Sequence, residues 1–342
     1  MISSPTDTIS INVDMAIMDS LGTSPSAFSK TPADAWCEAM QREDFARAWA
    51  IADKTLLPET GFRKHTGPRH LQRIWRGEPL AGRRVLVRCY HGLGDTLQFC
   101  RFLAPLRAIA REVILWCQPE LIPLLSDIAG ADRVIPLHDG TPDVAYDVDI
   151  EIMELAHALR ATRAAISDSV PYLTLDRLSR NERVRIPSPR MNRHTDRRYY
   201  AVGVVWQPGN WDQRRSIPVQ TLKLLQRPGM RMYSLQRGAS PDDLQALGAE
   251  DASASRIVAL ATAIRSLDLL VTIDSMPAHL AGAMGANVWT LLHADCDWRW
   301  RRDASHTAWY PTMRLFHQRT AGDWHGVMAA VGTALDRLAP AA

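Results

Sequence analysis

Asp95 is the residue whose setting most suggests chemistry. It closes a turn containing Gly92 and Gly94, after an apolar run at residues 83–89 and before helical periodicity at 96–111. A β-branched run, a tight turn and a helix predict the opening unit of a Rossmann-like layer. Asp95 then lies at a helix start, where its carboxylate either caps free N–H groups or faces the crevice beyond the strand's carboxyl end. His91 begins the same loop.

A second candidate is the turn at Asp274 and Ser275, which follows the apolar run 269–273. Pro277 stands in the first turn of the helix predicted there, where its missing N–H costs little. Such a helix start carries unpaired N–H groups and a partial positive charge, which suit a phosphate. The alternative is purely structural: Ser275 caps the helix and His279 is a packed core histidine.

A third candidate is the polar loop 207–216, which follows the apolar run 200–206 and contains Arg214 and Arg215. Paired guanidinium groups hold a diphosphate in bidentate fashion and stabilise a leaving group without a metal. Ordinary surface arginines are the alternative. The three loops, around Asp95, Arg215 and Asp274, all follow the carboxyl ends of predicted strands, which favours one shared site.

The segments 295–303 and 309–312 are dense in Trp and Arg. They could clamp a sugar or a base through stacking and cation–π contacts. Equally, their indoles could wedge two domains together, and the structural role is the favoured one.

The elements that must position these residues alternate between strand and helix twice along the chain, which predicts parallel sheets covered by helices on both faces. Two Rossmann-like halves follow, at residues 78–178 and 199–342, with the site in the crevice between them. The predicted strands are 83–89, 113–117, 133–136, 144–150, 200–206, 232–235, 256–258, 269–273 and 287–292, and the predicted helices are 96–111, 119–128, 153–163, 219–225, 261–267, the segment ending at 285, and 324–338.

Three further segments complete the domain organisation. Residues 1–30 are polar with little periodicity and are expected to form a flexible tail. Residues 31–77 carry apolar residues at helical spacing and predict a helical hairpin, either a remnant of one tetratricopeptide unit or a hairpin of a general kind. Residues 179–198 shift to Arg, Asn, Pro and Ser, which is typical of a linker.

Composition excludes several other classes of protein. A chain of 342 residues with 46% apolar and 23% charged residues is an ordinary globular one, and a net charge of +3 without an aromatic-basic motif argues against nucleic acid. Five cysteines without a Cys-x-x-Cys pair argue against a disulfide framework and a structural zinc site. Neither a leader nor a run of about 18 apolar residues is seen, so a cytoplasmic location is expected. Zinc-protease, α/β-hydrolase and Walker motifs are absent as well.

Residues 75–87 and 92–99 resemble the catalytic region that follows tetratricopeptide repeats in bacterial proteins of the glycosyltransferase family 9 type, a group related to the ADP-heptose lipopolysaccharide heptosyltransferases. Other matching segments follow in the family's order and rough spacing: 202–206, 215–218, 234–236, 267–269, 272–283, 297–300 and 309–312. The resemblance covers residues 70–338, and the set as a whole makes it specific.

The resemblance implies a GT-B fold and inversion at the sugar carbon without a metal or other cofactor. The first domain would hold the acceptor, through the loop of His91, Gly92 and Gly94, with Asp95 as general base. The second would hold a nucleoside-diphosphate sugar through Trp206, Gln207, Arg214, Arg215, Gln236, Asp274, Ser275, Met276 and His279. Two departures from the family pattern stand out: Tyr90 and His91 replace acidic or amide residues, and Met276 and Pro277 replace smaller ones.

The acceptor can be a glycan, a small molecule or a protein, and peripheral membrane contact through the arginine-rich first domain is compatible with the sequence. The rival function is a non-catalytic, degenerate GT-B module that binds a nucleotide-sugar or a partner protein.

Overall fold

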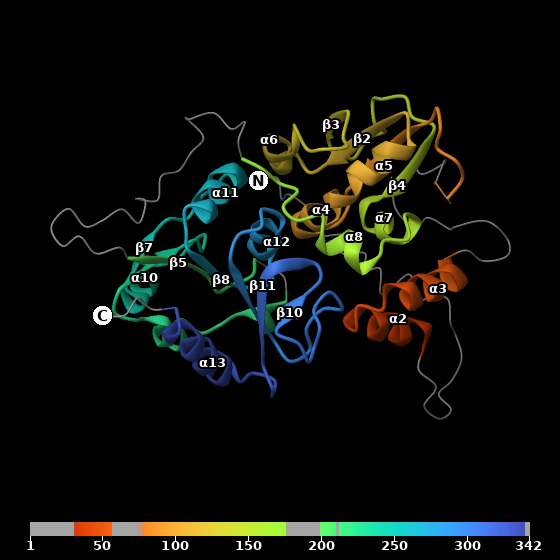
Figure 1. The fold of residues 1–342 in the computed structure, drawn as a ribbon. Helices are drawn as coiled ribbons and strands as arrows, with labels where there is room; N and C mark the ends of the chain where they lie inside the picture. Colours follow the sequence, from red (N-terminus) through yellow and green to blue (C-terminus); the bar gives the residue numbers. More distant parts are fainter. Residues whose placement is uncertain (1–30, 57–74, 76, 176–198, 210–211, 339–342) are drawn as a thin grey trace, which may run out of the picture.

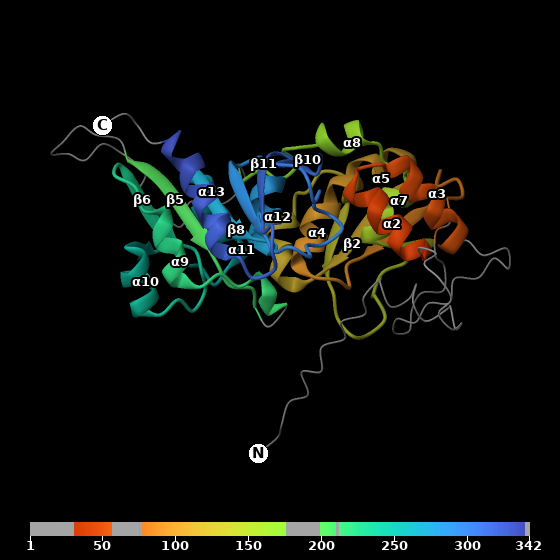
Figure 2. The same ribbon diagram turned by 90° about the horizontal axis from the view of Figure 1, so that it is seen from below.

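The computed structural model describes residues 31–56, 75, 77–175, 199–209 and 212–338. It contains one parallel sheet and one mostly parallel sheet, set side by side (Figures 1 and 2). We call the elements from β1 to α8 the first lobe and those from β5 to α13 the second lobe. The expected tail at 1–30 and the expected linker at 179–198 lie outside the described residues.

The sheet of the first lobe has the strand order β3-β2-β1-β4, with all neighbours parallel. Its strands β1 and β2 are almost completely buried, as expected for a parallel sheet covered on both faces, whereas β3 is partly exposed and β4 buries Asp149 and Glu151. The strands are β1 Arg84–Arg88, β2 Glu112–Cys117, β3 Arg133–Pro136 and β4 Val148–Glu151, and the helices are α4 Leu93–Phe99, η1 Cys100–Phe102, α5 Leu103–Ile109, η2 Pro119–Leu121, α6 Ile122–Leu125, η3 Ile152–Glu154, α7 Leu155–Ala158 and α8 Arg163–Ser167.

The sheet of the second lobe has the order β10-β11-β9-β8-β5-β6-β7, parallel except for the pair β10 and β11. Its strands are β5 Tyr200–Val205, β6 Met230–Ser234, β7 Ala249–Asp251, β8 Leu269–Ile273, β9 Val288–Leu292, β10 His306–Thr307 and β11 Tyr310–His317. Its helices are η5 Gln213–Arg215, α9 Val219–Leu222, η6 Lys223–Leu225, α10 Pro241–Leu247, α11 Ile257–Arg265, α12 Met276–Ala283 and α13 Trp324–Asp336. Two such lobes facing each other are the GT-B arrangement, as the sequence predicted.

Several local predictions were wrong. The strand expected at 256–258 is instead the start of α11, because Val258, Ala261 and Ile264 recur at helical spacing and are all buried. The long helix expected at 96–111 is divided by the 3-10 turn η1. The helix expected at 153–163 is interrupted at Arg160, whose φ of 53° is left-handed. The sequence reading also missed α10, although Ser240 and Asp243 form a capping box there, and it missed β11.

Two N-terminal helices, α2 Pro32–Gln41 and α3 Phe45–Leu56, pack against each other. Thr31 caps α2, and its capping box with Asp34 explains where the helix begins. Figure 1 shows the pair beside α8 and beside the loop that leads to β10. We call α2 and α3 together the N-terminal hairpin.

One of the apolar clusters is shared by both lobes, while the second lobe also has a separate cluster of its own. A single cluster of buried side chains runs from Met40 in the N-terminal hairpin, through Leu97 and Leu103 in the first lobe, to Leu280 and Tyr310 in the second. Helices α4 and α12 are the main contact between the lobes, and both views place them next to each other (Figures 1 and 2). The loops that precede these two helices are therefore brought together.

Candidate functional site

Asp95 lies at the third position of α4, in the loop that continues from β1. Its Oδ2 accepts a hydrogen bond of 2.9 Å from the backbone N–H of Gly92, so the capping role allowed by the sequence is present. Its Oδ1 accepts a hydrogen bond from Arg299 of the second lobe. The carboxylate therefore both caps its own helix and faces the opposite lobe.

Gly94 lies where α4 meets α12. A Cβ atom at this position would lie 2.8 Å from Cδ2 of His279, closer than real Cβ atoms approach other groups. The absence of a side chain thus lets the Asp95 loop come into direct contact with the second lobe.

Arg299 is the residue that joins the two lobes at this point. Besides Asp95, it donates from Nη1 to Asp297 Oδ1 at 2.9 Å and from Nε to Gln98 Oε1 at 2.8 Å. Its guanidinium carbon lies 4.3 Å from the ring centroid of Trp298, a cation–π contact. Burial opposes its charge, but the carboxylates of Asp297 and Asp95 outweigh burial and raise the pKa of Arg299 above its ordinary value.

Sequence reasoning placed Arg299 in a Trp/Arg-rich segment without singling it out. The signal that could have identified it is the alternation of Asp297 and Arg299, two residues apart, in a segment with no predicted helix. Its partner Asp95 is 204 residues away in sequence, so the pairing itself could not be read from local spacing.

Arg215 and Asp274 form the second part of the site. Arg215 Nη1 donates to the backbone O of Asp274 at 2.9 Å and lies 3.3 Å from its Oδ2. The Arg215 side chain is 17% exposed and that of Asp274 is 5% exposed. Burial raises the pKa of Asp274, while the Arg215 charge counteracts the rise. One guanidinium therefore ties the loop after β5 to the loop after β8.

The two neighbouring arginines do not act as a pair in this structure. The Arg214 side chain is 62% exposed and contacts Asp212 Oδ2 at 2.8 Å and Asp295 Oδ2 at 3.2 Å, whereas Arg215 turns toward Asp274. Only Arg215 faces the start of α12.

The start of α12 is not capped by a side chain. Ser275 is the N-cap residue, but its hydroxyl donates to the backbone O of Ile273 at 3.3 Å. Pro277 occupies the first turn, and Met276 beside it is partly buried. Of the two roles that the sequence allowed for Ser275, the capping bond is not the one observed.

His279 is buried between the lobes. Its Nδ1 lies 3.0 Å from the hydroxyl of Tyr310, its ring stacks on Trp300 with centroids 5.5 Å apart, and its Nε2 is 3.9 Å from Asp274 Oδ1. Burial, together with the charges of Arg299 and Arg215, lowers the pKa of His279 well below its ordinary value. The imidazole is therefore neutral near pH 7, and it packs and positions rather than carrying charge.

Gln236 fixes the backbone at the carboxyl end of β5. Its Oε1 accepts from the backbone N–H groups of Trp206, at 3.1 Å, and Gln207, at 2.9 Å. The Trp206 side chain is fully buried. In this arrangement Trp206 and Gln236 shape the loop that leads to Arg215.

His91 lies on the first-lobe side of the site. Its Nε2 is 3.9 Å from Glu151 Oε1, and its backbone O accepts from Gln118 Nε2 at 2.6 Å. Burial raises the pKa of Glu151 to about 8 and lowers that of His91. Glu151 ends β4 and was not noticed in the sequence, because nothing local distinguishes it from other strand-end carboxylates.

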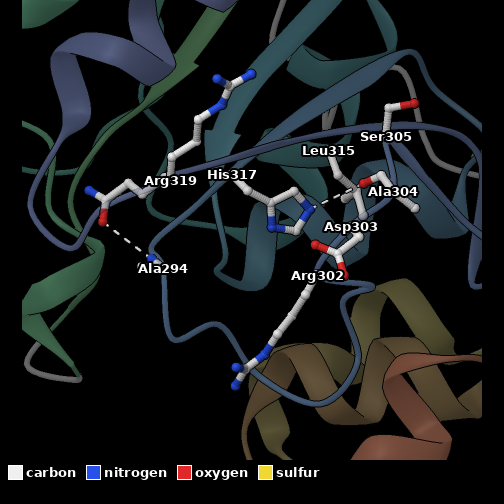
Figure 3. A pocket seen from close by; sticks show the side chains of 9 residues that line it. Ala294, Arg302, Asp303, Ala304, Ser305, Leu315, His317 and Arg319 are labelled. Atoms are coloured by element: carbon white, nitrogen blue, oxygen red, sulfur yellow. Dashed lines mark hydrogen bonds between the residues drawn. The ribbon is translucent and has the colours of Figure 1, made fainter.

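A separate pocket of about 580 Å³ lies at the carboxyl end of β11 and is shown in Figure 3. His317 Nε2 contacts the backbone O of Ala304 at 3.2 Å across it. Its lining comprises Ala294, Arg302, Asp303, Ala304, Ser305, Leu315, His317, Gln318 and Arg319. Arg302 and Asp303 belong to the Trp/Arg-rich segment 295–303, but none of the residues predicted for the acceptor loop or the donor site lines the pocket.

Within the described residues, no helix has the length and apolar character needed to cross a membrane. No family model matches the chain. Among curated proteins the chain is similar to Protein FlbA of Caulobacter vibrioides, with 24% identity over 303 residues that cover 76% of this chain and 48% of that protein. The chain thus spans about half the length of the curated relative it matches.

Similar solved structures include a glycosyl transferase family 9 protein from Veillonella parvula, with a TM-score of 0.48, 14% identity, and coverage of 76% of this chain and 96% of that one. Another is the ADP-heptose lps heptosyltransferase II of E. coli, with a TM-score of 0.49, 13% identity, and coverage of 75% of this chain and 98% of that one.

Proposed function

We propose that the chain is an inverting, metal-independent glycosyltransferase that moves a sugar from a nucleoside-diphosphate sugar to a hydroxyl acceptor. The first lobe, within residues 78–178, would bind the acceptor, and the second, within 199–342, the donor. The observation that carries the proposal is the contact of the Asp95 loop with Arg299 and with His279 of α12, the helix whose start holds Asp274 and its partner Arg215.

Asp95 is the proposed general base. A base must lie within hydrogen-bond reach of the hydroxyl proton that it removes. Its carboxylate is 22% exposed and faces the second lobe through Arg299, so an acceptor hydroxyl can reach it from solvent. His91 and Glu151 line the same side and would contact the acceptor.

Arg215 and the start of α12 are the proposed seat of the donor diphosphate. The uncapped helix start offers backbone N–H groups and a partial positive charge, and the guanidinium of Arg215 lies beside it. Together they would stabilise the negative charge that develops on the departing nucleoside diphosphate. This supports a mechanism in which no metal ion is required.

The test is transfer from a panel of ADP-, GDP- and UDP-sugars by the parent chain and by Asp95→Asn. Asparagine keeps the size and the acceptor oxygen for Gly92 but cannot take the proton, so kcat should fall by about 10²- to 10⁴-fold. Donor binding, followed by thermal shift, should persist in the variant. Transfer by Asp95→Asn at the parental rate would refute the role of Asp95.

The second candidate is a non-catalytic module of the same fold. The observation that favours it is that both oxygens of Asp95 already accept hydrogen bonds, from Gly92 and from Arg299. Under this alternative a nucleoside-diphosphate sugar raises the thermal stability of the chain, but no sugar is transferred to any acceptor and Asp95→Asn changes nothing but stability.

A further inference from the structure

We propose that the N-terminal hairpin contributes to the candidate site by positioning its residues. It positions Arg299 against Asp95 by bracing the segment 297–309 against the first lobe. Trp36, Glu43 and Trp298 are therefore positioning residues that act through Arg299. Only the description of Asp95 as the base rests on the proposed function.

The hairpin is anchored to the first lobe along α3. Trp49 donates from Nε1 to the backbone O of Ala161 at 2.9 Å, in a buried position. Asp53 receives Arg160 at 2.8 Å and contacts His157 Nε2 at 2.8 Å. These contacts fix α3 on the segment that joins α7 and α8.

The same hairpin reaches the second lobe through α2 and the start of α3. The rings of Trp36 and Trp298 meet edge to face with centroids 5.0 Å apart, and Phe45 meets Trp309 in the same manner at 5.6 Å. Aromatic pairs of this geometry attract each other beyond their burial alone. The hairpin thus contacts both lobes.

Glu43 connects the two sets of contacts. Its Oε1 accepts the backbone N–H of Ala308 at 2.6 Å, and its Oε2 lies 3.0 Å from Arg163 Nη2 of the first lobe and 3.7 Å from Arg301 Nη1 of the second. The side chain is 1% exposed. A buried carboxylate that contacts cations from two lobes makes their separation costly, because opening would leave its charge unpaired.

The backbone at Glu43 is consistent with this role. Its φ is 56°, a left-handed conformation that glycine or asparagine would adopt more easily. The strained backbone directs the carboxylate toward Ala308 and Arg163 rather than to solvent. A turn that served only to reverse the chain would require no buried glutamate there.

The path from the hairpin to Asp95 is short and continuous. Trp36 packs on Trp298, the Trp298 ring lies under the Arg299 guanidinium, and Arg299 bonds Asp95. Because Trp298 and Arg299 are adjacent in sequence, displacement of the Trp298 ring also moves the Arg299 side chain. The hydrogen bonds of the Asp95 carboxylate come from Gly92 and Arg299, neither of which belongs to the hairpin, so an effect of hairpin substitutions on the Asp95 loop passes through this path.

Hydrogen exchange of backbone amides tests the proposal without an activity assay. In Trp36→Ala and Glu43→Gln, exchange should accelerate about tenfold or more at residues 297–309 and also at residues 92–99, since the Gly92 amide is protected by Asp95. Trp36→Phe, which keeps an aromatic edge against Trp298, should restore most of the protection. Arg47→Ala, an exposed position on α3, is the matched control and should exchange like the parent.

Residues 112–117 of β2 serve as the internal reference because they form an interior strand of the first sheet, between β3 and β1. Faster amide exchange at residues 297–309 with parental exchange at 92–99 would overturn the proposal. An equal acceleration of exchange at residues 112–117 would also overturn it, because the hairpin would then only stabilise the fold as a whole.

If the chain transfers sugar, the same variants should lose kcat while the KM for the donor stays near the parental value, because Arg215 and α12 are not displaced. If no transfer is detected with any donor, the proposed function fails while the exchange result still decides whether the hairpin positions Asp95.

Discussion

Replacing Gly94 by alanine tests how closely the lobes approach each other. The added Cβ would lie 2.8 Å from Cδ2 of His279, and this ring cannot easily retreat because it stacks on Trp300 and bonds the hydroxyl of Tyr310. Overpacking of a fixed interior costs about 1–3 kcal/mol. Alanine regains about 0.5–1 kcal/mol of helix propensity over glycine. From the middle of these two ranges, the net expectation is a loss of about 1 kcal/mol in the free energy of unfolding.

Urea denaturation followed by circular dichroism measures this loss. Gly209→Ala is the control, because its Cβ would meet nothing within 4 Å, and it should change stability by no more than about 0.5 kcal/mol. In a double-mutant cycle, His279→Ala should remove most of the cost of Gly94→Ala, since the two positions are in contact. If Gly94→Ala is as stable as the parent, or if its cost persists after His279 is truncated, the described packing of α4 on α12 is wrong.

Two further predictions concern titration and thiol chemistry. Burial raises the pKa of Glu151 from 4.5 to about 8, so the folded chain binds the Glu151 proton more tightly than the unfolded chain and its stability falls as pH rises from 4.5 to 8. In urea titrations the stability of Glu151→Gln relative to the parent should therefore increase between pH 5 and pH 8. A stability difference that stays constant over this range would contradict the assignment. Four cysteines are buried and have raised pKa values, Cys89, Cys100, Cys117 and Cys296, whereas Cys37 is half-buried. An aromatic disulfide reagent should therefore modify one thiol in the native chain and the other four only on unfolding. Rapid reaction of two or more thiols in the native chain would refute the burial.

The fold class could be predicted because its signal is repeated and local. Buried parallel strands such as β1, β2 and β8 are short apolar runs between turns, and helices alternate with them, so the two-sheet prediction is confirmed by the strand order. The segment 256–258 failed because Ile and Val suit both states, and only the burial of Ala261 and Ile264 further along decides for a helix. A relation of the hairpin to tetratricopeptide units stays a prediction.

The candidate site could be predicted only up to its loops. Each of Asp95, Arg215 and Asp274 follows an apolar run that predicts a strand, and ligands of open α/β sheets bind beyond the carboxyl ends of strands, which is why these loops were singled out. Arg299 was not, because its importance comes from partners that lie far away in sequence and from the packing of Trp298 on Trp36. The contacts of Glu43 were hidden for the same reason: a glutamate between two helices is expected to be solvated.

The apolar cluster shared by the hairpin and both lobes affects folding during synthesis. On the ribosome, residues 39–175 emerge before residues 257–315, although both groups belong to one cluster. Part of the apolar surface of the hairpin and the first lobe packs on Trp309 and Leu280, so it stays exposed to solvent until β11 has been synthesised. Newly made chains therefore pass through a stage exposed to aggregation, during which a chaperone that binds apolar surface would raise the yield of native protein.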